Sequence, residues 1–169
     1  MQKNGKGKQV LLITDVAGYS KVALSAMLPV LTHLGYDLYN LPTALVSNNF
    51  AYGEYAFLDT TDYMRDTIKV WDELGFDPDC ICTGFVLSEE QVELIGDYIR
   101  SRKPRMDEIQ NVDNGRLVMV DPIMADGGKL YNGIGMERVA AMRKLVSYSD
   151  VMVPNMTEAG FLTGICPGR

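Results

Sequence analysis

Short strand-like runs alternate with segments of helical periodicity along most of this chain, and this alternation restricts it to few folds. The strand-like runs cover residues 9–14, 36–41, 79–83, 117–120 and 150–154. Apolar side chains recur at helical spacing over residues 22–34, 60–74, 88–99 and 135–146. Strands that alternate with helices join into sheets whose crossover helices cover both faces. The sequence therefore predicts an α/β fold with a mainly parallel sheet and helices on both faces.

Local turn and cap signals set the expected ends of several elements. We expect the first strand to end at Asp15, which would then lie in the following loop. Pro42 predicts a turn, with a further extended piece at 43–47. Ser88 followed three residues later by Gln91 matches a capping box, which predicts the start of a helix.

The size and charge of the chain define its broad class. A chain of 169 residues with 47% apolar content can bury a substantial core, and no boundary is visible inside 9–164. We therefore expect residues 1–169 to form a single domain. The formal net charge of −6 excludes the basic surface that nucleic acid or an anionic membrane would require.

Three cysteines and one histidine limit the redox and metal chemistry. Cys80 and Cys82 form a C-x-C inside an expected strand, and we expect no disulfide between them. The cysteines and the single histidine provide no zinc ligand set. No apolar run is long enough to span a bilayer, and residues 1–9 are polar, so we expect a cytoplasmic protein without a signal peptide.

Residues 116–133, RLVMVDPIMADGGKLYNG, combine a strand-like run with acids and glycines. The run delivers Asp121 to its end, and Pro122 with the Gly127–Gly128 pair predicts an irregular loop that carries Asp126. Ligands bind at strand ends in open α/β sheets, so this pattern indicates a metal or phosphate site. An ordinary strand-ending turn explains the same residues, and both interpretations stay open.

Three predicted loops after strands carry carboxylates or amides. They contribute Asp15, the pair Asp121 and Asp126, and the N-x-x-E of Asn155 and Glu158. Because strand ends of a parallel sheet lie on one edge, we expect these side chains to converge there, where oxygen ligands suit magnesium. Asn155 and Glu158 are also a structural helix cap, and Asp15 is also a turn-forming aspartate.

Nucleotide-binding glycine motifs are missing from the sequence. It contains neither Walker-type spacing nor a G-x-G-x-x-G, which argues against P-loop and dinucleotide-binding proteins. Lys129 offers a charge for a phosphate, although a lysine beside two glycines is usually solvated.

Residues 48–59, NNFAYGEYAFLD, are rich in aromatic side chains and lack a clear period. These rings, at Phe50, Tyr52, Tyr55 and Phe57, indicate either a flap over a ligand or a subunit contact. Packing of the same rings onto the sheet is the alternative.

The motifs in this order resemble the pyridoxal/pyridoxine (vitamin B6) kinases of the ribokinase-like superfamily, over about Val10 to Thr163. The most specific pieces are VMVDPIMADGGKLYNG at 118–133 and DVMVPNMTEAGFLTG at 150–164. TALVSNNFAYG at 43–53 and ICTGF at 81–85 support them.

This resemblance implies transfer of the ATP γ-phosphoryl group to the 5'-hydroxymethyl of a B6 vitamer, with Mg²⁺ and often K⁺. It assigns the vitamer pocket to Asp15, Val22, Ala44, Val46, Asn49 and Phe85. It assigns nucleotide and phosphate binding to Asp121, Asp126, Tyr131, Asn155 and Glu158. The metal would be held by Asp121 and Glu158, and residues 43–59 would form a lid and dimer contact in a homodimer.

The sequence departs from the family pattern inside the pocket. Asp15 stands where many relatives have serine, Asn49 where many have histidine, and Phe50 where a hydroxyl-bearing residue is common. These departures bear on which vitamer is bound and on how its ring is hydrogen-bonded.

The sequence also lacks the family's glycine-rich G-x-G-D segment, which supplies the anion hole and the catalytic aspartate. In the family this segment lies beyond the position of Arg169, the last residue of the sequence, so the resemblance assigns no catalytic residue here. We therefore expect a kinase as the parent protein. We expect this chain to be an N-terminal portion with little activity and an unprotected sheet edge.

Two alternatives follow from the same residues. A hydroxymethylpyrimidine or sugar kinase of the same superfamily would share the phosphate side and differ in the acceptor pocket. A non-catalytic vitamer-binding module would keep part of the pocket without the transfer machinery.

Overall fold

The computed structural model describes residues 8–48, 52–102 and 116–165. Asn49 and Phe50, with their expected places in the pocket and the lid, lie outside these ranges. Arg169, beyond which the family resemblance places the catalytic aspartate, also lies outside them. Among the described residues, no helix combines the length and the apolar content needed to cross a bilayer.

A six-stranded sheet forms the centre of the molecule, with the strand order β3-β2-β1-β4-β5-β8. The strands are β1 (Gln9–Ala17), β2 (Asp37–Val46), β3 (Phe57–Asp59), β4 (Cys80–Thr83), β5 (Leu117–Val120) and β8 (Val151–Met152). Every neighbouring pair is parallel except β2 and β3, which are antiparallel. The predicted mainly parallel α/β fold is confirmed.

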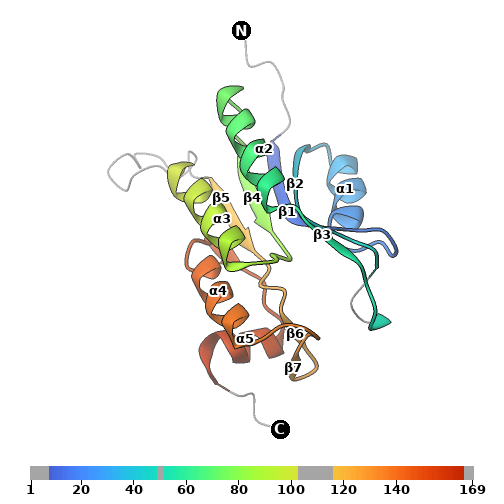
Figure 1. The fold of residues 1–169 in the computed structure, drawn as a ribbon. Helices are drawn as coiled ribbons and strands as arrows, with labels where there is room; N and C mark the ends of the chain where they lie inside the picture. Colours follow the sequence, from blue (N-terminus) through green and yellow to red (C-terminus); the bar gives the residue numbers. More distant parts are fainter. Residues whose placement is uncertain (1–7, 49–51, 103–115, 166–169) are drawn as a thin grey trace.

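Helices cover both faces of the sheet (Figure 1). They are α1 (Leu24–His33), α2 (Thr61–Glu73), α3 (Glu89–Arg102), α4 (Met136–Val146) and α5 (Met156–Thr163). Successive residues of β1 point to opposite faces, so Val10 and Leu12 pack under α1, whereas Leu11 and Ile13 join the larger core. Each fully buried aliphatic side chain contributes about 2 kcal/mol through burial of apolar area.

The first strand is longer than predicted and includes Asp15, which the sequence pattern places in a loop. Thr14 pairs with Pro42 and Val16 pairs with Leu45, so β2 carries one extra residue opposite Asp15. This bulge lets the apolar end of β1 continue along β2, and sequence periodicity does not reveal it.

The predicted turn at Pro42 is wrong, because a single strand runs through it. Proline cannot donate to a ladder and is tolerated in a sheet at a bulge. Pro42 pairs with Thr14 just before the register shift, where the ladder is already irregular. Its carbonyl accepts a hydrogen bond from Oγ1 of Thr60 at 2.6 Å.

The predicted irregular loop after β5 contains a small hairpin of β6 (Ala125–Asp126) and β7 (Lys129–Leu130). Gly127 and Gly128 form its two-residue turn, with φ values of 57° and 82°. Tight hairpin turns with positive φ at both positions favour glycine. Asp126 is therefore held by a strand.

Candidate functional site

A cavity of about 690 Å³ lies at the carboxyl ends of the parallel strands. Its walls come from β1 and the loop that follows, β2, the loop after β4, and the β6–β7 hairpin. The lining includes residues from both predicted sets, namely Asp15, Val22, Val46, Phe85, Asp126 and Tyr131. Residues far apart in sequence thus meet at one sheet edge, which is where ligands bind in open α/β folds.

Asp15 presents a nearly buried carboxyl group to this cavity, with only 8% of the residue exposed. Burial raises the pKa of Asp15, and the hydrogen bond that Oγ1 of Thr14 donates to Oδ1 at 3.2 Å opposes the shift. The group is thereby more readily protonated than an exposed aspartate, and it can then donate as well as accept a hydrogen bond.

Phe85 forms a wall between this cavity and a smaller one of about 280 Å³. Ala44 lines the smaller cavity, and Val46 lines both. The preceding residue must be small, because a Cβ on Gly84 would lie 2.5 Å from Oγ1 of Thr14. Gly84 thus lets the chain pass close to β1, and Phe85 is the next residue along the chain.

Glu158 is nearly buried and is tied to the start of the hairpin segment. Its Oε1 accepts from the N–H of Met124 at 3.1 Å, and its Oε2 accepts from the N–H of Asn155 at 2.9 Å. Burial and the negative charge of Glu158 raise the pKa of Asp121 to about 6. The two predicted metal ligands are therefore electrostatic neighbours.

Asn155 caps α5, as the capping interpretation predicts. Its Oδ1 accepts from the N–H of Glu158 at 2.9 Å, and Glu158 completes the capping box. The Nδ2 of Asn155 donates to the carbonyl of Ala125 at 2.8 Å. This amide thus joins the start of α5 to the start of β6.

Tyr131 lies on the cavity wall and close to three acids of the expected phosphate set. Burial raises the pKa of Tyr131, and the charges of Glu158, Asp126 and Asp121 raise it further, in that order. All three acids therefore lie near one phenol. Asp121, Asn155 and Glu158 are not among the residues that line the cavity. Asn155 and Glu158 instead contact the start of the hairpin segment, at Ala125 and Met124.

Asp121 and Glu158 could supply only part of the ligand shell of a cation. Among the described residues, no group of three or more histidine, cysteine, aspartate or glutamate side chains could hold a metal ion. A divalent cation between Glu158 and Asp121 would relieve the repulsion between their charges. Oxygen atoms of a phosphate or of water would have to complete its shell.

Sequence reasoning missed other residues of the cavity. These are Asn48 and Asn132, which line it. Lys129, which the sequence offers as a charge for a phosphate, lines the cavity as well. The Gly127–Gly128 pair is a hairpin signal, and it would have placed Lys129 and Asn132 beside the acids.

No family model matches the chain. It is similar to a protein of Bacteroides thetaiotaomicron assigned as a phosphomethylpyrimidine kinase and crystallised with pyridoxal, with 33% identity, a TM-score of 0.85, and 94% and 52% coverage of the two chains. It is similar to pyridoxal kinase of Lactobacillus plantarum, with 32% identity, a TM-score of 0.82 and coverage of 95% and 54%. Pyridoxal kinase of Leishmania donovani with ADP and pyridoxamine shares the fold, at 22% identity, a TM-score of 0.83 and coverage of 95% and 56%. The chain thus spans about half the length of these kinases.

Proposed function

We propose that this chain, which has a ribokinase-like α/β fold and is similar to part of the pyridoxal kinases, binds the vitamer and the phosphates in an ATP-dependent kinase. The reaction is phosphorylation of the 5'-hydroxymethyl group of pyridoxal, pyridoxine or pyridoxamine. One observation carries the proposal: a single cavity is lined by Phe85 and Asp15 from the expected vitamer set and by Asp126 and Tyr131 from the expected phosphate set.

The vitamer side combines apolar walls with one acid. Val22, Val46 and Phe85 offer flat and aliphatic surfaces that suit a pyridine ring. The raised pKa of Asp15 lets its carboxyl group share a proton with a ring hydroxyl or nitrogen. Serine, common at this position in relatives, offers a single hydroxyl, so this chain would bind the ring polar groups differently.

The phosphate side supplies position and charge. Lys129 places a cation on the cavity wall, on the strand that leads to Tyr131. Asp121 and Glu158 would hold Mg²⁺, which neutralises phosphate charge when bound. Phosphoryl transfer depends mainly on such positioning and neutralisation.

We further propose that this 169-residue chain alone transfers phosphate slowly or not at all. Up to Arg169 it contains no G-x-G-D segment to accept the hydroxyl proton and to surround the transferring group with backbone N–H donors. Loss of either function removes orders of magnitude of rate. Binding of the vitamer would persist, because the residues that line the cavity are present in this chain.

A hydroxymethylpyrimidine kinase is the second candidate, because one similar structure is assigned as a phosphomethylpyrimidine kinase. That structure contains pyridoxal, which favours the vitamer. Isothermal titration of the chain with pyridoxine, with hydroxymethylpyrimidine and with ribose decides between the acceptors. We expect pyridoxine to bind saturably. Hydroxymethylpyrimidine should compete with it only weakly, and ribose should not compete with it. Saturable binding of only the pyrimidine, or of none of the three, would overturn the vitamer assignment.

A further inference from the structure

The position of Phe85 is set by hydrogen bonds to its backbone. Its N–H donates to Oγ1 of Thr14 at 3.0 Å, and its carbonyl accepts from Oγ1 of Thr43 at 2.7 Å. Thr14 also donates to Asp15, and both threonines are buried. The ring wall and the acid of the cavity therefore share one set of buried hydrogen bonds.

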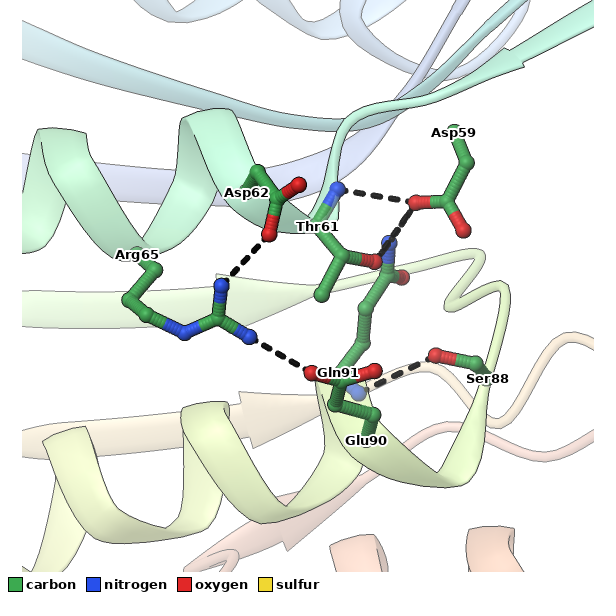
Figure 2. A network of polar contacts seen from close by, with 7 residues as sticks. All are labelled: Asp59, Thr61, Asp62, Arg65, Ser88, Glu90 and Gln91. Carbon is green, nitrogen blue, oxygen red and sulfur yellow. Dashed lines mark hydrogen bonds and ion pairs between the residues drawn. The ribbon is translucent and has the colours of Figure 1, made fainter.

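Gln91 holds this set from the protein interior. The residue is fully buried, and its Nε2 donates to the carbonyl of Thr43 at 2.8 Å and to Oγ1 of Thr61 at 3.0 Å. Its Oε1 accepts from the N–H of Leu87 at 2.8 Å. Figure 2 shows this side chain extending from the start of α3 toward Thr61 at the start of α2. One amide thus joins β2, α2, α3 and the loop after β4.

The residue type matters more than the volume it fills. A buried amide costs free energy unless its groups are paired, and here both donors and the acceptor have partners. An apolar side chain of equal size would fill the same space without fixing Thr43 or Leu87. Arg138 holds the same loop from α4 by donating to the carbonyls of Val86 and Leu87.

The sequence pattern assigns Gln91 a different role from the observed one. Its backbone N–H does donate to Oγ of Ser88 at 3.2 Å, which is one half of the predicted capping box. Its side chain bonds instead to Thr43, Thr61 and Leu87. The side-chain amide of Gln91 therefore supports the segments on either side of Phe85 in the cavity wall.

We propose that Gln91 is a positioning residue for the ligand cavity, which fixes Thr43 and Leu87 and through them sets Phe85 and Asp15. The inference rests on the proposed function, because it takes the ligand to be a vitamer ring. Gln91 does not contact the cavity itself. Its effect on affinity would be transmitted through the backbone of residues 84–87.

The test compares two replacements of residues that bridge α2 and α3. Gln91→Met keeps the length of the side chain and removes the hydrogen bonds that the side-chain amide makes. Arg65→Met is the matched control, since Arg65 joins Asp62 at 2.6 Å and Glu90 at 2.5 Å on the surface (Figure 2). The probe is pyridoxine, which has no aldehyde to react with lysine. Titration at a temperature where both variants are folded should show about tenfold weaker binding by Gln91→Met and less than twofold change in the control.

Equal affinity of wild type and Gln91→Met would overturn the inference, whereas absence of binding by the wild type would overturn the proposed function instead. If Gln91→Met does not fold, Thr43→Val takes its place, because it removes only the hydroxyl that holds the Phe85 carbonyl. Thr43→Ser keeps that hydroxyl and should restore the affinity. Wild-type affinity in Thr43→Val, or equal weakening in Thr43→Val and Thr43→Ser, would also overturn the inference.

Discussion

Glu158 lies close enough to Asp121 for its negative charge to add to burial in raising the pKa of Asp121 to about 6. The two residues follow β8 and β5, which are adjacent parallel strands. Parallel pairing therefore brings together Asp121, in the loop after β5, and Glu158, in the first turn of α5 after β8. Their proximity is the arrangement that a kinase needs where phosphates and a cation meet.

Replacement of Glu158 tests this relationship. Glu158→Gln removes the charge and retains a side chain that can complete the capping box. We expect the pKa of Asp121 to fall toward its ordinary value, because one of the two causes of the shift is removed. Carbon-13 NMR titration of the Asp121 carboxyl group measures it. An unchanged pKa would show that the two groups do not interact.

The raised pKa of Asp121 also predicts a dependence of stability on pH. The folded chain binds the proton more tightly than the unfolded chain, so stability falls as the pH rises from about 4 to about 6. Asp121→Asn abolishes this contribution. We expect the variant to gain about 1 kcal/mol relative to wild type between pH 4 and pH 7, because partial exposure reduces the full effect. Urea denaturation at both pH values measures the difference, and a constant difference would contradict the assignment.

The ring at Phe85 should determine affinity for the vitamer. Phe85→Tyr keeps the aromatic wall and should bind pyridoxine within about threefold of wild type, whereas Phe85→Leu should bind about tenfold more weakly through loss of ring contacts. Titration calorimetry of the two variants checks the contrast. Equal affinities would mean that the ring does not contact the ligand.

Any side chain at position 84 should lower the stability of the fold. Gly84→Ala brings a Cβ within 2.5 Å of Oγ1 of Thr14 and within 2.9 Å of its Cβ, in a buried region. We expect a loss of about 2 kcal/mol of stability, because the chain must move away from β1. Denaturation by urea measures this loss. An unchanged midpoint would show that the approach to Thr14 is loose.

The features that could be predicted from sequence depend on neighbours along the chain. The alternation of strands and helices indicates the correct fold class, and Asn155 with Glu158 indicates a cap that the structure contains. Asp121 follows directly from the end of an apolar run at Val120. Each of these signals is complete within a few residues.

The features that could not be predicted depend on distant partners. Asp15 stays in β1 because of the extra residue in β2, which belongs to another strand. Gln91 acts through Thr43, and neither residue signals the other in the sequence. The hairpin at Gly127 and Gly128 is the exception, since its turn residues are visible in the sequence and yet indicated only an irregular loop.

The most direct test of the account is a crystal structure of this chain with pyridoxine, ADP and Mg²⁺. We predict the pyridine ring against Phe85 and Asp15, with its 5'-hydroxymethyl group directed toward the hairpin that carries Asp126. The metal should lie beside Asp121 and Glu158. A ring bound outside this cavity, or phosphates remote from both of those acids, would contradict the account.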